Sequence, residues 1–225
     1  MLRRAISIAI KAAIVLALIP VVLVPLYAFV PPVSNVMVWR LLTGSPVIRE
    51  WRSLDEISPN LVRAVIAAED ARYCQHRGVD WVEVAHAIDD AEEIAEARGA
   101  STIPMQTAKN LFLWPGRNVV RKVLEVPIAY YMSFMWTKRR MMEVYLNVAE
   151  WGPNGEFGVE AAARRAFRKN ARSLLPEEAA LLAAVLPNPN RRDASRPSAG
   201  LQRIGARYRA QADIAGSPIT ACLAQ

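Results

Sequence analysis

The sequence is poor in cysteine and shows few signs of β-structure. Its two cysteines, Cys74 and Cys222, are too few and too far apart to build a zinc site. Beyond residue 30 the chain lacks convincing alternation of polar and apolar residues, internal repeats and low-complexity runs. A β-sheet domain, a repeat array and a long disordered segment are therefore not expected.

Apolar residues, which make up 53% of the chain, are concentrated at its start. Residues 12–30 carry no charged side chain, and their length matches one bilayer crossing. Arg3, Arg4 and Lys11 precede this run, so the positive-inside rule predicts a single-pass anchor with a cytoplasmic N-terminus. The alternative is a cleaved signal peptide, but its best cleavage site, after Ala28, lacks the expected small residue two positions earlier. About 185 residues then remain, enough for one sizeable core and no second catalytic domain.

Helical signals are frequent in the remainder of the chain. Ser58 predicts the start of a helix whose apolar face leads up to Glu69. Asp80 and Glu83 form a capping-box pattern that predicts the start of another. We expect helices at about 59–69, 80–98, 101–113, 118–135, 138–149, 158–168, 176–186 and 200–213. The predicted fold is one all-α lobe on a membrane stalk.

Positive charge gathers between residues 105 and 142. Glu125 is the one acid there, among seven basic residues: Lys109, Arg117, Arg121, Lys122, Lys138, Arg139 and Arg140. Such a stretch attracts phosphate, whether on nucleic acid, lipid headgroups or a pyrophosphate. An aromatic run at 126–136 lies within it, which suits an amphiphile with an anionic head. A buried helix with a solvated basic end is the alternative, and composition alone favours it.

The segment 69–80 holds the strongest candidate for catalysis. Glu69 follows four apolar residues, so desolvation could raise its pKa and make it a usable general base. Asp70, His76 and Asp80 follow within the same segment. The alternative is an ordinary helix end, with solvated carboxylates, a turn at His76 and a cap at Asp80.

Later segments also combine polar and charged residues. Ser101 and Thr102 can expose backbone N–H groups to an anion, with Lys109 about two turns further on. Arg121 and Glu125 are four residues apart, which an intrahelical ion pair explains. An amphipathic helix accounts for the residues at 138–147. Each of these segments has a plain structural explanation when it is taken alone.

Together, in this order and spacing, the segments resemble the peptidoglycan glycosyltransferase family, which includes class A penicillin-binding proteins and monofunctional transglycosylases. Over about residues 50–190 its motifs are matched by Glu69, Asp70, Tyr73, His76, Gly78, Asp80, Gly99, Ser101, Thr102, Ile103, Gln106, Lys109, Asn110, Arg121, Lys122, Glu125, Lys138, Glu143, Tyr145, Leu146 and Asn147. The residues at 149–152 and 157–162 resemble the monofunctional branch. Met105 departs from the pattern, because the family has a second glutamine there, and Gln106 is the amide that remains.

The resemblance implies a lysozyme-like fold and an enzyme that polymerises lipid II into β-1,4-linked glycan by inverting transfer, releasing polyprenyl pyrophosphate. It implies that Glu69 is the base and that Glu125 is a second essential carboxylate. Lys109 and Arg117 would neutralise the departing pyrophosphate. The implied substrate-binding residues are Asp70, His76, Ser101, Thr102, Gln106, Lys109, Asn110, Arg117, Arg121, Lys122 and Asn147. No cofactor and no dedicated metal site are expected, although Mg²⁺ or Mn²⁺ could bind the pyrophosphate.

The expected organisation is a cytoplasmic segment at 1–11, an anchor at 12–30, a membrane-proximal segment at 31–49, the glycosyltransferase domain at 50–190, and a C-terminal loop, helix and tail at 191–225. The expected place is the outer face of the bacterial inner membrane. Expected partners are lipid II, the growing strand, the bilayer and other cell-wall synthesis proteins, but no nucleic acid. A glycan-cleaving lysozyme-like or lytic enzyme and a non-enzymatic membrane scaffold are the alternatives.

The two cysteines leave two possibilities open. Cys74 and Cys222 both lie beyond the anchor, in a compartment that permits disulfides, so a bridge between them is one expectation. The other is a small buried thiol at Cys74 and a free thiol in a frayed tail at Cys222.

Overall fold

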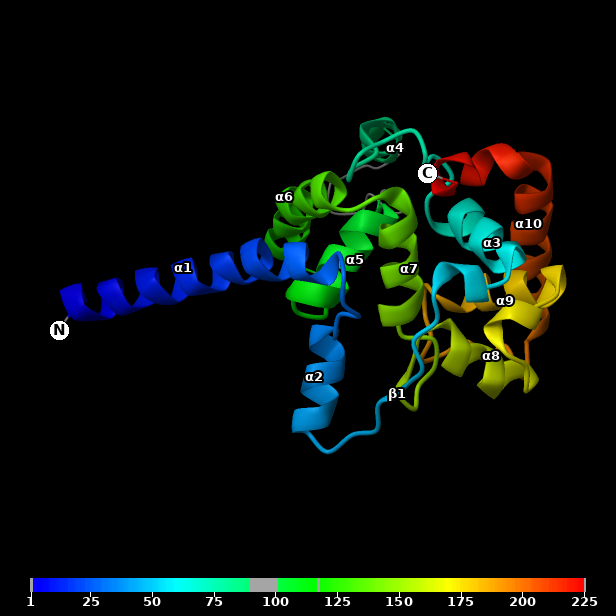
Figure 1. Ribbon diagram of the computed structural model, residues 1–225, viewed down its shortest axis with the longest axis horizontal. Helices are drawn as coiled ribbons and strands as arrows, with labels where there is room; N and C mark the ends of the chain where they lie inside the picture. The colour runs from blue at the N-terminus through cyan, green and yellow to red at the C-terminus, as the bar shows by residue number, and fades with distance from the viewer. Residues whose placement is uncertain (1, 90–100, 117, 225) are drawn as a thin grey trace.

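The computed structural model describes residues 2–89, 101–116 and 118–224, and their regular structure is mostly helical, as predicted (Figure 1). The α-helices are α1 (Leu2–Tyr27), α2 (Asn35–Leu42), α3 (Pro59–Glu69), α4 (Trp81–Asp89), α5 (Ile103–Phe112), α6 (Val119–Met135), α7 (Lys138–Val148), α8 (Val159–Phe167), α9 (Pro176–Val185) and α10 (Ala199–Ala215). The short 3-10 helices are η1 (Leu54–Glu56), η3 (Ala171–Ser173) and η4 (Ser217–Leu223). Two short strands, β1 (Ile48–Arg49) and β2 (Glu156–Phe157), pair in parallel. This pair and an isolated antiparallel bridge between Glu150 and Phe157 depart from the predicted all-α arrangement.

Helix α1 extends away from the other helices (Figure 1). It begins at Leu2 and ends at Tyr27, so it is not confined to the segment at 12–30 that the sequence predicts as an anchor. Many of its apolar side chains are exposed, among them Leu16 and Val22. Within the part of the chain that the structure describes, however, none of the helices combines the length and the apolar character that a bilayer crossing requires.

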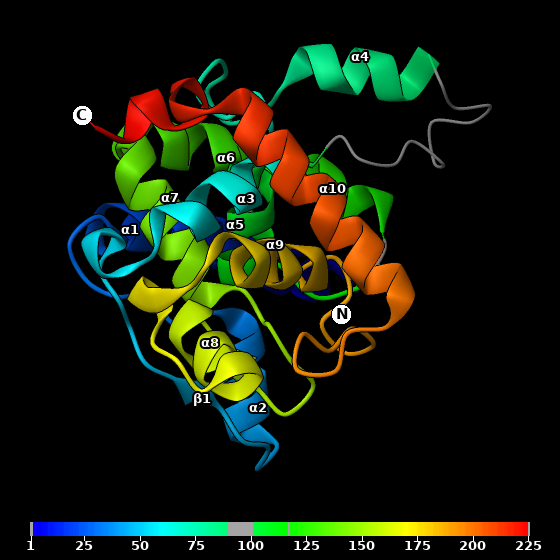
Figure 2. The same ribbon diagram turned by 90° about the vertical axis from the view of Figure 1, so that its right-hand side faces the viewer.

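Most of the remaining helices pack around one hydrophobic core, whereas α4 projects away from them (Figures 1 and 2). On one side α3 packs against α9 and α10, and on the other α5 packs against α6 and α7. The apolar face of α3 contributes Leu61, Val65 and Ile66, which are fully buried. Helix α7 contributes Met142 and Leu146. At the carboxyl end of α3, Glu69 contacts Gln106 of α5.

Helix starts agree with the sequence prediction in position but not always in the capping side chain. Asp80 caps α4 as predicted, because its Oδ1 accepts from the N–H groups of Val82 and Glu83 at 3.1 and 3.3 Å. Ser58 precedes α3, but its hydroxyl donates to the carbonyl of Leu174 and does not cap the helix. The part of the predicted 80–98 helix beyond residue 89 lies outside the described residues.

A disulfide joins Cys74 to Cys222, with their Cα atoms 5.5 Å apart. Of the two possibilities left open by the sequence, the structure therefore has the bridge. Cys222 lies in η4, which follows α10 and contacts α3. Cys74 lies in the loop that follows Glu69. The bridge ties the end of the chain to the loop that carries the candidate catalytic segment.

We expect Cys222→Ser to lower the stability of the exported protein, because the bridge closes a loop with a sequence separation of 148 residues. The chain-entropy model gives an upper bound of about 5 kcal/mol for such a loop. The measurement is the free energy of unfolding with and without a reductant. A reductant that lowers the stability of wild type but not of the variant would support the bridge. Two free thiols in folded, exported wild-type protein, found by mass spectrometry of non-reduced peptides, would contradict it.

Candidate active site

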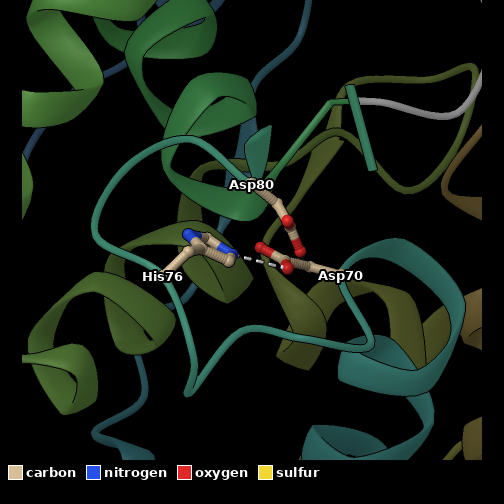
Figure 3. Close-up of side chains that lie close together, drawn as sticks. All are labelled: Asp70, His76 and Asp80. Atoms are coloured by element: carbon tan, nitrogen blue, oxygen red, sulfur yellow. Dashed lines mark hydrogen bonds and ion pairs between the residues drawn. The ribbon is translucent and has the colours of Figure 1, made fainter. Parts of the chain in front are cut away.

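The loop at 70–80 is folded around the side chain of Asp70. One of its oxygens lies 2.8 Å from Nε2 of His76, and the other accepts from the N–H of Ile103 at 2.9 Å (Figure 3). Ile103 is the first residue of α5, where a carboxylate also interacts favourably with the helix dipole. Asp70 therefore joins the end of α3 to the start of α5. This contact brings the first and second motif segments together.

Asp80 holds the far end of the same loop. Its Oδ2 accepts from Nε of Arg72 at 2.9 Å, while its Oδ1 caps α4. Gly78 lies between these residues in the loop and has a φ of +93°, and a Cβ there would come within 3.1–3.2 Å of the backbone of Ala129 and Tyr130 in α6. The glycine thus lets the loop pass close to α6.

Asp70, His76 and Asp80 also form a group whose ligand atoms lie within 4.8 Å of one another (Figure 3). Both carboxylates already accept hydrogen bonds on each of their oxygens, and Arg72 supplies positive charge beside Asp80. A divalent cation would have to displace these donors. The donor set therefore fits a cluster that shapes the loop better than it fits a metal site.

Glu69 is the last residue of α3 and lies at the centre of the candidate site. Its Oε2 accepts from Nε2 of Gln106 in α5 at 2.8 Å. Its Oε1 has no hydrogen-bond partner among the described residues. Burial raises the pKa of Glu69, while the Gln106 hydrogen bond and the charge of Lys109 act in the opposite direction. A carboxylate with a raised pKa and one oxygen free suits a general base.

A cluster of charged side chains lies at the starts of α5 and α6. Glu125 is buried and forms ion pairs with Arg121 and, at 3.3 Å, with Lys122. Lys122 also donates to the hydroxyl of Ser101. The pair of Arg121 and Glu125 is the intrahelical pair that the sequence predicts, and its burial makes it more than a surface contact.

Lys109 connects this cluster to Glu69. Burial lowers the pKa of Lys109, and both Glu125 and Glu69 act to raise it again. The neighbouring Arg121 and Lys122 lower it further. A partly buried ammonium that feels the charges of two carboxylates provides positive charge where a phosphate could bind.

Two other residues predicted to bind substrate, Thr102 and Asn147, make mainly structural contacts. Thr102, rather than Ser101, caps α5 by accepting from the N–H of Met105, and its own hydroxyl donates to the carbonyl of Gly78. Asn147 is fully buried, and its side chain bonds the backbone of Arg52 and Glu143. That geometry favours a role in the fold over the substrate contact predicted for Asn147.

Asn110 lies in α5 and has no polar side-chain partner among the described residues. Arg117, predicted as a pyrophosphate ligand, lies outside the described residues.

Two residues near Glu69 were not predicted as site residues. Tyr145 of α7 donates its hydroxyl to Oε1 of Gln106 at 3.2 Å. Arg192 lies in the loop after α9, donates to the carbonyl of Ala184 at 2.6 Å, and its charge lowers the pKa of Glu69. Tyr145 is part of a matched motif, which was a usable signal. Arg192 is more than a hundred residues from Glu69 in sequence, and no local pattern pointed to it.

Comparison with known proteins agrees with the motifs. A family model described as "Transglycosylase" matches residues 37–212. A protein of Nitrobacter winogradskyi named biosynthetic peptidoglycan transglycosylase is 50% identical over 214 residues, which cover 95% of each chain. Proteins of the same name from Rhodopseudomonas palustris and Agrobacterium fabrum are each 49% identical, over 94% and 92% of this chain and 93% and 92% of their own. The chain therefore belongs to the transglycosylase family, among relatives named for the biosynthesis of peptidoglycan.

Proposed function

We propose that this protein is a peptidoglycan glycosyltransferase that polymerises lipid II into β-1,4-linked glycan strands. The observation that carries this proposal is the arrangement at the end of α3, where Glu69 has one oxygen without a hydrogen-bond partner among the described residues, and where the charge of the partly buried Lys109 acts on it. Such a pair matches a reaction that needs a base for a hydroxyl group and positive charge for a pyrophosphate. The names of the relatives support the same activity.

In the proposed reaction, Glu69 removes the proton from the 4-hydroxyl of the acceptor sugar, because an alcohol is a poor nucleophile at neutral pH. The oxygen attacks the anomeric carbon of the donor from the side opposite the leaving group, and polyprenyl pyrophosphate departs. The inverted centre is the new β-1,4 linkage. Pyrophosphate is a good leaving group, so the reaction depends more on charge stabilisation than on a strong acid.

Lys109 supplies that charge stabilisation in the proposed mechanism, together with Arg117. Glu125 holds Arg121 and Lys122 in place through its ion pairs, and it favours the charged form of Lys109. Glu125 therefore acts as a positioning residue for the cations. A divalent cation such as Mg²⁺ or Mn²⁺ on the substrate pyrophosphate would add to this charge, and its requirement stays a prediction.

We further propose that the helical lobe at 50–190 is lysozyme-like and that the segment at 12–30 anchors it to the outer face of the inner membrane. The exposed apolar side chains of α1 support an apolar environment for that helix. Phe134 of α6 is 84% exposed, and this fits a surface that admits the lipid tail of the substrate. We keep the predicted assignment of residues 1–11 to the cytoplasm and of residues 191–225 to a C-terminal loop, helix and tail.

The rate of polymerisation should depend on pH as a bell-shaped curve. Glu69 must be deprotonated to act as the base, and because its pKa is raised, activity should be lost on acidification at a higher pH than for an ordinary glutamate. Lys109 must be protonated, and because its pKa is lowered, activity should be lost on the alkaline side earlier than for an ordinary lysine. The measurement is kcat/KM for lipid II against pH. A flat profile across both limbs would contradict these roles.

A glycan-cleaving enzyme is the alternative that shares a helical lobe and a catalytic glutamate. The two activities use different substrates, so the same purified protein can be offered labelled lipid II in one reaction and finished cell-wall sacculi in another. We expect polymer from lipid II and no soluble fragments from sacculi. Fragments from sacculi without polymer from lipid II would favour cleavage, and neither product would favour a non-enzymatic scaffold.

A further inference from the structure

A chain of hydrogen bonds leads from the core of the protein to Glu69. The hydroxyl of Tyr145 lies 3.2 Å from Oε1 of Gln106, and Nε2 of Gln106 lies 2.8 Å from Oε2 of Glu69. Tyr145 is 1% exposed, so its side chain is almost completely removed from solvent. Each of the three residues comes from a different helix, α7, α5 and α3.

The chain has a direction, because an amide has a donating end and an accepting end. A carboxylate accepts only, so it selects the NH₂ end of Gln106. The other end, Oε1, then needs a donor, and the hydroxyl of Tyr145 supplies one. With the amide turned around, Oε1 of Gln106 would face the carboxylate of Glu69, and two acceptors would repel each other.

We propose that Tyr145 is a positioning residue for the catalytic base: its hydroxyl fixes the amide of Gln106 so that Nε2 holds Oε2 of Glu69 and leaves Oε1 for the acceptor hydroxyl. This inference rests on the proposed function for the role of Glu69, but the hydrogen-bond chain itself does not. Tyr145 touches no reacting atom in this account and acts through Gln106.

The phenol of Tyr145 is suited to remain a donor at every pH at which the enzyme would work. Burial raises its pKa well above the ordinary value, and the negative charges of Glu69 and Asp70 raise it further. It therefore keeps its proton while Glu69 titrates. A side chain that lost its proton in the same range would reverse the hydrogen bond to Gln106.

Several charged groups face Glu69 from the surrounding elements and set its pKa together with Gln106. Lys109 of α5 and Arg192 of the loop after α9 lower it, whereas Asp70, the next residue in the chain, raises it. Removing the Tyr145 hydroxyl alters none of these charges. Any change in the titration of Glu69 in a Tyr145→Phe variant would therefore come from the weakened hydrogen bond of Gln106.

The test is Tyr145→Phe, read out by the ¹³C chemical shift of the Glu69 carboxyl group against pH, with the signal assigned by its loss in Glu69→Gln. We expect the Glu69 pKa to rise by about 0.5 or more, because the hydrogen bond that favours its charged form is less well held. The acid limb of kcat should move to higher pH by the same amount. At pH values above this acid limb, where Glu69 is deprotonated in both proteins, kcat of the variant should be about five- to tenfold below that of wild type, with KM for lipid II nearly unchanged.

Tyr73→Phe is the matched control. Tyr73 is also fully buried, and its hydroxyl also makes one hydrogen bond, to the carbonyl of Lys138 at 2.7 Å. It should leave the Glu69 titration where it is in wild type, whatever it does to stability. Gln106→Met should raise the pKa at least as much as Tyr145→Phe, and adding Tyr145→Phe to it should change the titration no further.

The inference is overturned if Tyr145→Phe titrates like wild type, or if its effect adds in full to that of Gln106→Met. The carboxyl titration does not require turnover, so it gives this answer even if wild type failed to polymerise lipid II. Such a failure would count against the proposed function alone.

Discussion

Glu69→Gln should abolish glycan polymerisation and leave the protein folded. Glutamine has nearly the same volume and can still accept from Nε2 of Gln106 through its own carbonyl oxygen. It cannot remove a proton from the acceptor hydroxyl. Positioned bases are typically worth about 10²–10⁴-fold in rate, so we expect a loss in that range or beyond.

Stability should respond in the opposite sense to activity. Burial raises the pKa of Glu69, so its charged form costs folding free energy at neutral pH, and this cost appears as the pH rises through the pKa of the unfolded state. The neutral glutamine removes this cost. We therefore expect Tm at pH 7 to be equal to or above that of wild type.

Glu177→Gln is the matched control for this experiment. Glu177 belongs to α9, is more than half exposed and pairs with Arg209 at the surface, so its loss should change neither activity nor Tm appreciably. The measurements are initial rates with lipid II and thermal unfolding of all three proteins. Retention of more than about a tenth of the wild-type rate by Glu69→Gln would remove Glu69 from the role of base.

Lys109→Met should have the second largest effect, a loss of about 10²-fold or more in rate. The substitution keeps the apolar length of the side chain and removes the charge that we assign to the departing pyrophosphate. Stability should change less, because burial already disfavours the charged form of Lys109. Arg117→Met is expected to lower the rate for the same reason.

Lys169→Met separates this effect from a general loss of positive charge. Lys169 pairs with Glu178 of α9 at 2.7 Å and is not among the charges that act on Glu69 or Lys109, so it should be dispensable for polymerisation. The comparison is the rate of each variant at saturating lipid II. Normal turnover by both Lys109→Met and Arg117→Met would require the anion-site hypothesis to be abandoned.

Much of the helical fold could be predicted from local sequence. The apolar face that leads to Glu69 and the cap at Asp80 are properties of neighbouring residues, and α3 begins and ends where they indicated. The cap of α5 was less predictable, because Ser101 was the expected cap and Thr102 is the residue that accepts from the N–H of Met105. The hydroxyl of Ser101 instead accepts from Lys122, a residue of another helix.

The connections within the site could not be predicted from local sequence. The motifs placed Glu69, Gln106 and Tyr145 in three separate segments, but their order along the hydrogen-bond chain depends on how α3, α5 and α7 pack. The same is true of Asn147, which the motif placed near substrate and which packing turned toward the backbone of Arg52. Motif residues that bind substrate and motif residues that build the fold look alike in one sequence.

The most direct test of the proposed function is the stoichiometry of the reaction with lipid II labelled in both its sugar and its lipid. Detergent-solubilised protein should release one polyprenyl pyrophosphate for each new glycosidic bond, and the product should be a glycan that a muramidase digests. Glu69→Gln should release none. Absence of polyprenyl pyrophosphate and of polymer with active, folded wild-type protein, or release of the lipid without bond formation, would contradict the proposal.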